Sequence, residues 1–166
     1  MTHILITGGA ASGKSLYAEN RLTALPGPHH YIATAEAGDA EMAARIARHR
    51  ARRGSAWIEH HAPLDLAEAL GRAEGPVLVD CLTLWLSNLI FAERDPEAET
   101  ARLLDALAAR TAPAILVTNE IGLGVVPDNA LARRFRDAQG ALNQAVAAAA
   151  AEVRLVVSGL SIQVKP

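Results

Sequence analysis

Short apolar runs alternate along the chain with longer segments in which apolar residues recur at helical spacing. The runs of strand length occupy residues 4–7, 31–34, 77–80, 114–118 and 153–157. The segments between and after them predict helices over residues 14–25, 39–53, 64–73, 82–91, 96–110 and 129–151. Runs such as Val77-Leu78-Val79 are continuously apolar, as expected of parallel strands that are buried on both faces. The pattern predicts an α/β fold: a mostly parallel sheet covered by helices on both faces.

Composition favours one domain. The chain has 166 residues, 51% of them hydrophobic, which is enough for one sizeable core and short for two, so residues 1–166 are predicted to form a single domain. A formal net charge of −2 argues against nucleic-acid binding through overall charge. No apolar run approaches the roughly 20 residues of a membrane span, and no export signal is apparent at the start of the chain.

The single cysteine, Cys81, excludes an internal disulfide bond and fits a cytoplasmic protein. We interpret Cys81 as a small apolar residue.

The segment after the first apolar run carries the clearest chemistry. It matches the pattern GxxxxGK[S/T], in which glycines let backbone N–H groups surround phosphate oxygens. Lys14 brings positive charge to the β- and γ-phosphates, and Ser15 offers a hydroxyl to Mg²⁺. Lys14 is one of only two lysines in the chain, which a merely structural glycine-rich turn does not explain. The predicted ligand is a nucleoside triphosphate, held by Gly8, Gly9, Ala10, Ala11, Ser12, Gly13, Lys14 and Ser15, with Lys14 also catalytic.

Other candidate residues follow the later strands. Ligands of open parallel sheets bind beyond the carboxyl ends of the strands. Asp80 is placed at such a strand end, where phosphate-loop enzymes carry the carboxylate that holds Mg²⁺. An aspartate at this position also suits a helix cap. Given the phosphate loop we prefer the metal role, with Ser15 and Asp80 as Mg²⁺ ligands. Glu120 suits two roles that stay open: accepting a substrate proton or holding Mg²⁺ through water, and capping the loop that follows.

A basic segment, residues 45–53, holds five of the fourteen arginines and one histidine. At helical spacing Arg45, His49 and Arg52 or Arg53 share a face. Flanking positive charge lowers the pKa of a histidine and so favours a neutral, nucleophilic imidazole. A solvated basic helix face explains the same residues equally well, and composition alone leaves both interpretations open.

Several motifs together resemble one enzyme family. They are GGAASGKS, YIATA, the RIxxH pattern of Arg45, Ile46 and His49, VDCLTLWLSNL, and TNEIGLGVVPDNALARRFRDAQGALNQ. The chain resembles, almost end to end, the bifunctional adenosylcobinamide kinase/adenosylcobinamide-phosphate guanylyltransferases of cobalamin synthesis. The phosphate loop is widespread, but its combination with RIxxH and TNExGxGxVP is specific to this family.

The resemblance implies a P-loop NTPase-like fold and two reactions. One phosphorylates adenosylcobinamide with ATP or GTP, and the other transfers GMP from GTP to the product and releases pyrophosphate. His49 falls on the family's nucleophile, which forms a guanylyl-histidine. The remaining nucleotide contacts implied by the family fall on Ala33, Thr34, Ala35, Arg50, Ala51, Arg52, Arg53 and Asp80.

One position departs from the family pattern. Where the family has a glutamate four residues after the residue that matches Trp57, this chain has His61. A neutral imidazole still hydrogen-bonds a ribose or a base, so we carry the nucleotide-binding role over to His61, with a surface histidine of no role as the alternative.

The resemblance also bears on assembly and on the corrinoid substrate. It implies a homotrimer, and apolar residues of 82–91 (Leu84, Trp85, Leu86, Leu89 and Ile90) suit either a subunit contact or a core helix. Arg133, Arg134 and Arg136 suit contact with the corrinoid phosphate, but solvated helix charge explains at least two of them better.

Two other functions remain as alternatives. One is a small-molecule kinase without the guanylyl transfer, and the other is a nucleotide-gated binding module. The guanine-reading NKxD pattern of signalling GTPases is absent, since residues 118–121 read TNEI. A preference for GTP therefore rests on the family resemblance alone.

Overall fold

The computed structural model describes residues 3–36, 38 and 40–166, without the side chains of residues 41, 42, 45, 49, 52 and 55. In this described part, seven strands form one sheet in the order β3-β2-β4-β5-β1-β6-β7. Neighbouring strands are parallel except β7, which runs antiparallel to β6. The strands are β1 (Ile4–Gly8), β2 (His29–Ala33), β3 (Trp57–His61), β4 (Val77–Asp80), β5 (Ala114–Val117), β6 (Glu152–Val157) and β7 (Leu160–Lys165).

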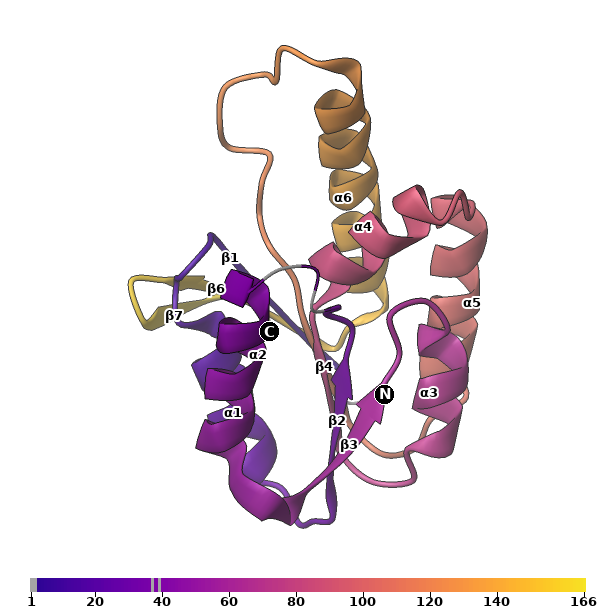
Figure 1. The fold of residues 1–166 in the computed structure, drawn as a ribbon. Helices are drawn as coiled ribbons and strands as arrows, with labels where there is room; N and C mark the ends of the chain where they lie inside the picture. Colours follow the sequence, from indigo (N-terminus) through magenta and orange to yellow (C-terminus); the bar gives the residue numbers. More distant parts are fainter. Residues whose placement is uncertain (1–2, 37, 39) are drawn as a thin grey trace.

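Helices cover both faces of the sheet, as the apolar runs predict (Figure 1). Alternate residues of one strand point to opposite faces. Val77 and Val79 belong to the core under α3 to α6, and Leu78 belongs to the core under α1. The helices are α1 (Lys14–Thr23), α2 (Ala40–Arg53), α3 (Leu66–Arg72), α4 (Leu82–Phe91), α5 (Pro96–Ala108) and α6 (Ala130–Ala149), with a 3₁₀ turn at Gly54–Ala56 between α2 and β3.

All five predicted strands are present to within two residues, and β4 and α4 begin and end as predicted. The first residue of the predicted helix over 39–53, residue 39, lies outside the described residues. The pattern of apolar runs did not predict β3 and β7, the two strands at the edges of the sheet. Edge strands are covered less completely than central ones, so β3 carries polar residues and β7 leaves Leu160 and Ile162 exposed. Neither segment therefore shows the continuous apolar run of a buried strand.

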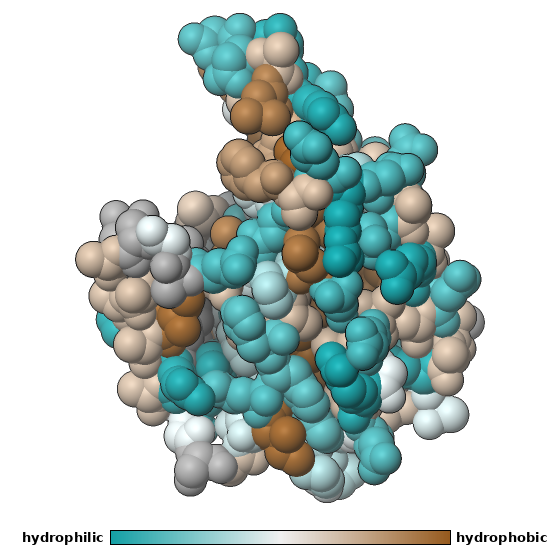
Figure 2. Space-filling model, turned by 45° about the vertical axis from the view of Figure 1, so that its right-hand side comes forward, coloured by the Kyte–Doolittle hydropathy of each residue, from teal (hydrophilic) through white to brown (hydrophobic). Residues whose placement is uncertain are grey.

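The connection from β5 to α6, together with the start of α6, projects from the body of the molecule (Figure 1). Large apolar side chains on this projection are exposed, among them Leu123, Val125, Val126 and Leu131. Figure 2 shows hydrophobic surface on the same projection, beside hydrophilic surface. Among the residues that the structure describes, the projection thus exposes large apolar side chains next to hydrophilic ones.

Among the described residues, no helix combines the length and the apolar character needed to cross a membrane. Cys81 is buried, and burial raises the pKa of its thiol to about 11.

His3 joins α5 to β5 through its imidazole ring. Its Nε2 lies 2.8 Å from the Leu107 carbonyl oxygen, and its Nδ1 accepts a hydrogen bond of 3.2 Å from the Ala114 N–H. An Nδ1 that accepts cannot carry a proton, so these contacts require the neutral ring protonated at Nε2. Burial lowers the pKa of His3, and the nearby charge of Arg110 lowers it further.

This geometry predicts acid sensitivity. Because the folded-state pKa of His3 lies below its unfolded value of about 6.5, the unfolded chain binds the proton more readily, and the contribution to stability is lost as pH falls below about 6.5. Protonation of Nδ1 removes the bond from Ala114, at a cost of about 1 kcal/mol. We expect the melting temperature to fall between pH 7.5 and pH 5.5, and to fall less in His3→Gln. An equal fall in both proteins would contradict this role of His3.

Candidate nucleotide-binding and catalytic site

The phosphate loop connects β1 to the first turn of α1. Gly13 has φ +92°, and a Cβ on Gly8 would clash with the Val156 carbonyl oxygen, so both positions require glycine. The Tyr17 N–H donates to the Gly13 carbonyl oxygen as α1 begins. Gly9, Ala10 and Ala11 are exposed at the start of the loop. The loop thus presents backbone N–H groups at a helix N-terminus, an arrangement that binds anions.

Lys14 is buried, and its ammonium group lies against the loop. Its Nζ donates a hydrogen bond of 2.9 Å to the Gly9 carbonyl oxygen. This places the positive charge at the loop that the sequence predicts to hold the phosphates.

The turn between β6 and β7 supports the phosphate loop from outside, a contact that the sequence analysis missed. The Gly159 N–H donates a hydrogen bond of 2.8 Å to the Ser12 carbonyl oxygen. A Cβ on Gly13 would lie 3.2 Å from the Gly159 Cα, so the two backbones touch. Ser158 and Gly159 both have positive φ, as a tight two-residue hairpin requires. In the sequence, this hairpin is indicated by the Ser-Gly pair, which lies between two segments in which apolar and polar residues alternate.

Residues 33–35, at the end of β2, are held in place by hydrogen bonds with Cys81 and Asn88. The fully buried Thr34 donates through Oγ1 to the Cys81 carbonyl oxygen at 2.7 Å and accepts from the Cys81 N–H at 2.8 Å. The Asn88 Nδ2 donates to the Thr34 carbonyl oxygen at 2.8 Å. With the Thr34 hydroxyl occupied and only methyl groups on Ala33 and Ala35, contacts from this segment to a ligand would come from its backbone.

Asp80 ends β4 and is half-buried. Its Oδ2 accepts a hydrogen bond of 3.2 Å from the Tyr31 hydroxyl. Burial, together with the charge of Asp80, raises the pKa of Tyr31 and so keeps the hydroxyl protonated as a donor. In the register of the sheet Asp80 pairs with Ala33 on one side and Val117 on the other. The carboxylate therefore lies at the edge of the sheet where the phosphate loop also lies.

The predicted metal ligands suit a hard cation. The described residues contain no group of three or more His, Cys, Asp or Glu side chains that could hold a metal ion by themselves. Mg²⁺ in nucleotide sites uses one or two protein oxygens and takes its other ligands from phosphates and water. A hydroxyl at Ser15 and a carboxylate at Asp80 fit that requirement.

Glu120 makes the contact expected of a residue that caps the loop after it. Its Oε1 accepts a hydrogen bond of 2.8 Å from the Gly122 N–H, and its own N–H donates to the Gly8 carbonyl oxygen at 3.1 Å. The structure thus shows the loop-capping contact and places the residue next to the phosphate loop.

The basic segment forms α2, with His49 one helical turn before the last residue of the helix. The side chains of Arg45, His49 and Arg52 lie outside the described residues, so the shared face predicted for them stays a prediction. Arg50 and Ala51 are exposed. Arg53 differs from them, since its side chain is only 4% exposed.

His61, at the end of β3, is exposed and lies beside the segment after β2. Its Nε2 is 3.3 Å from the Ala35 carbonyl oxygen. The structure therefore brings together two of the predicted nucleotide-binding positions, from β3 and from the end of β2.

Two of the three arginines near the start of α6 have local partners. Arg133 donates to the Pro127 and Asp128 carbonyl oxygens at 2.9 Å and 2.8 Å, and Arg136 pairs with Asp137 at 2.9 Å. Arg134 is exposed. These contacts fit the interpretation of Arg133 and Arg136 as structural or solvated charge.

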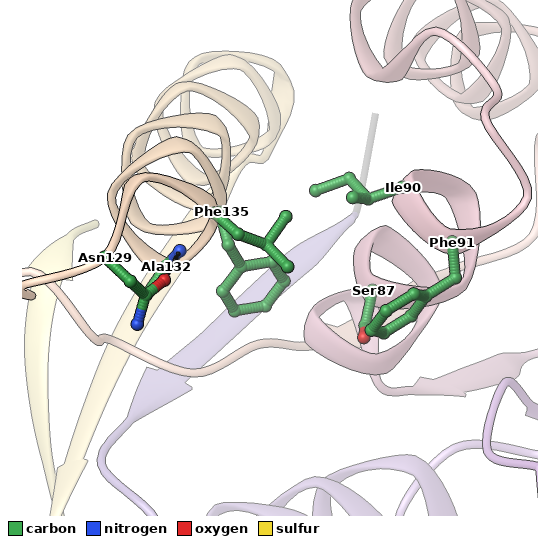
Figure 3. Close-up of a pocket in the computed structure, with 7 residues that line it drawn as sticks. Ser87, Ile90, Phe91, Asn129, Ala132 and Phe135 are labelled. Atoms are coloured by element: carbon green, nitrogen blue, oxygen red, sulfur yellow. Dashed lines mark hydrogen bonds between the residues drawn. The ribbon is translucent and has the colours of Figure 1, made fainter.

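Helix α4 is chiefly a core helix, with Trp85, Leu86 and Leu89 buried. Its outer end forms one wall of an apolar groove of about 230 Å³, and the start of α6 forms the other (Figure 3). None of the described residues of the predicted nucleotide site lines this groove. Its lining is Ser87, Ile90, Phe91, Asn129, Leu131, Ala132 and Phe135.

A mostly parallel sheet whose first strand leads through a glycine-rich, lysine-bearing loop into a helix defines a P-loop nucleotide-binding protein. A solved structure of similar fold is the flagellar accessory protein FlaH from Methanocaldococcus jannaschii, with a TM-score of 0.57 over 99% of this chain and 78% of that one. At 11% sequence identity this likeness concerns the fold alone.

Sequence comparison identifies the family. Residues 4–164 match the family model described as cobinamide kinase / cobinamide phosphate guanyltransferase. The bifunctional adenosylcobalamin biosynthesis protein CobP of Pseudomonas aeruginosa is 49% identical, with 97% of this chain and 96% of that protein covered. The corresponding CobU proteins of Salmonella typhimurium and Escherichia coli are 44% and 43% identical, with 98% of this chain and 99% of each relative covered.

The chain belongs to the cobinamide kinase / cobinamide phosphate guanyltransferase family, as its motifs indicated. It is an enzyme of cobalamin biosynthesis with kinase and nucleotidyltransferase activities. Family membership favours this function over a kinase without guanylyl transfer and over a nucleotide-gated binding module.

Proposed function

We propose that both reactions draw on a triphosphate held at the carboxyl edge of the sheet, and that His49 carries the guanylyl group from GTP to adenosylcobinamide phosphate. The observation that supports this proposal is convergence: the phosphate loop, the end of β2 and Asp80 all lie at that edge. The triphosphate is then open to attack at two phosphorus atoms.

In the kinase reaction, the aminopropanol hydroxyl of adenosylcobinamide attacks the γ-phosphorus of ATP or GTP, and the nucleoside diphosphate leaves. The loop N–H groups and Lys14 hold the phosphates and offset their negative charge. Ser15 and Asp80 would hold Mg²⁺, which offsets further charge on the β- and γ-phosphates. Glu120, beside the loop, is a candidate acceptor of the hydroxyl proton.

In the guanylyl transfer, a ring nitrogen of His49 attacks the α-phosphorus of GTP, and the bond to pyrophosphate breaks. A phosphate oxygen of adenosylcobinamide phosphate then displaces the imidazole and gives adenosylcobinamide-GDP. Arg50, Ala51 and Arg52 belong to the same helix as His49 and are proposed nucleotide contacts. The backbone of residues 33–35 and the adjacent His61 are proposed to contact the nucleoside.

We further propose that the enzyme is a cytoplasmic homotrimer, as the family resemblance implies. The exposed apolar side chains of the projection, Leu123, Val125 and Val126, are compatible with a subunit contact. The buried single thiol is compatible with a cytoplasmic location.

Labelled GTP tests the covalent step. The protein is incubated separately with α-labelled and γ-labelled GTP, and the protein fraction is examined for label that is acid-labile and stable in alkali. We expect label from the α position only, because the γ-phosphate leaves in pyrophosphate. No protein-bound label from either nucleotide, with phosphorylation of adenosylcobinamide intact, would reject the guanylyl-histidine and leave the kinase reaction standing.

A further inference from the structure

The side chain of Arg53 is enclosed by three other elements, although it lies in the most basic segment of the chain. Its guanidinium carbon is 3.4 Å from the centre of the Tyr31 ring on β2. Its Nη2 donates a hydrogen bond of 2.7 Å to the Glu59 Oε1 on β3. Its Nη1 is 4.0 Å from the Glu19 Oε1 on α1. Arg53 therefore connects the end of α2 to two strands and to the helix of the phosphate loop.

These contacts suit an arginine in particular. A guanidinium group is planar, so it stacks on an aromatic ring while its edge meets a carboxylate, which an ammonium group cannot do. Glu19 is itself buried, so its carboxylate lies in a poorly hydrated environment that favours a neighbouring cation. Arg50, by contrast, reaches Glu59 at 3.0 Å from a side chain that is 71% exposed. Solvent screens such an exposed pair, which contributes little to the position of a helix.

The same contacts reach the proposed metal ligand. The Tyr31 ring carries Arg53 on its face, and the Tyr31 hydroxyl donates to Asp80. In sequence, α2 ends at Arg53, and Gly54, with φ +71°, turns the chain toward β3. The last turn of α2, which begins at His49, is thereby joined through Arg53 and Tyr31 to Asp80 at the end of β4.

We propose that Arg53 is a positioning residue that fixes the last turn of α2, and with it His49, against β2 and β3, and that it is not a ligand of the nucleotide. The proposal rests on the guanylyl-histidine function proposed above for the role of His49. It differs from the contact that the family resemblance implies at Arg53, because a side chain enclosed by Tyr31, Glu59 and Glu19 offers little surface to a ligand.

The test compares Arg53→Met, which keeps most of the aliphatic stem and removes the cation, with the wild-type protein. At saturating GTP we expect the rate of self-guanylylation to fall by about 10- to 100-fold, since a nucleophile displaced by about 1 Å loses rate on that scale. The dissociation constant for GTP should change by less than about 3-fold, because no nucleotide contact is removed. The matched control is Arg21→Met, which breaks the Arg21–Glu152 pair of 2.8 Å and should leave the rate unchanged.

A second measurement does not depend on the chemistry. Amide hydrogen exchange over residues 46–53 should be at least about 10-fold faster in Arg53→Met than in the wild type, and unchanged in Arg21→Met. If exchange accelerates while the wild-type protein forms no guanylyl adduct, the positioning role stands and the proposed function fails. Unchanged exchange would overturn the positioning role whatever the chemistry shows.

Two further results also decide the matter. A 10-fold weaker GTP affinity with an unchanged rate at saturation would show that Arg53 binds the nucleotide and would overturn the proposal. If Arg53→Met does not fold, Glu59→Gln removes the carboxylate partner and keeps its shape. Like Arg53→Met, the Glu59→Gln variant should have a lower self-guanylylation rate at saturating GTP and an unchanged affinity for GTP. An unchanged rate would again overturn the proposal.

Discussion

Replacing His49 with alanine is expected to abolish the protein-bound label from α-labelled GTP and to lower guanylyl transfer by at least about 10³-fold, because the attacking nitrogen is gone. Phosphorylation of adenosylcobinamide should stay within about 3-fold of the wild-type rate, since the γ-phosphoryl transfer relies on Lys14 and Ser15. The measurements are the two product assays and the label retained on the protein.

His29→Ala is the matched control for this variant. His29 begins β2, at the opposite end of the strand from residues 33–35, and its Nε2 lies 2.8 Å from the Leu25 carbonyl oxygen. This replacement removes an imidazole outside the proposed site, so both reactions and the label should persist. Label retained at the wild-type level in His49→Ala would remove His49 from the mechanism.

Replacing Lys14 with alanine is expected to lower the kinase rate by about 10²- to 10³-fold, the usual cost of losing one group that stabilises charge in a transition state. The Lys14 ammonium group is held at the phosphate loop by its hydrogen bond to the Gly9 carbonyl oxygen. Alanine carries no charge that could replace it. Guanylyl transfer should fall as well, because the same loop holds the triphosphate. Steady-state kinetics with ATP and with GTP as phosphate donors measure both effects.

The chain has only one other lysine, Lys165, which provides the control. Its Nζ donates to the Ala147, Ala148 and Ala150 carbonyl oxygens at the end of α6. Lys165→Ala should therefore cost about 1 kcal/mol or more of stability without changing the catalytic constants. Wild-type kinase rates in Lys14→Ala would show that the phosphate loop does not have the assigned function.

The parts of the site that lie within one short segment were predictable. Gly8, Gly13 and Lys14 occur at the spacing that is characteristic of a phosphate loop. The apolar run before them and the helix after them are the context that such a loop requires. The position of Asp80 followed from the same logic, since the end of an apolar run marks the end of a buried strand.

Other parts depend on partners that are far apart in the chain. Arg53 was predicted, through the family resemblance, to contact the nucleotide together with its neighbours, yet its own aromatic and acidic partners come from β2, β3 and α1. Thr34 was predicted as a nucleotide contact through the family resemblance, and only the structure shows that its hydroxyl is bonded to the backbone of Cys81. The support of the phosphate loop by Gly159 joins residues almost 150 positions apart.

The sequence by itself determined the α/β alternation, the helices, the central strands, the phosphate loop and the family. These features depend on the spacing of apolar residues and on local backbone conformation, both of which act over a few residues. Only the tertiary structure decided the edge strands, the supporting turn at Gly159 and the enclosure of Arg53. Those depend on the order of strands in the sheet, which sets which distant side chains meet, and local spacing does not encode that order.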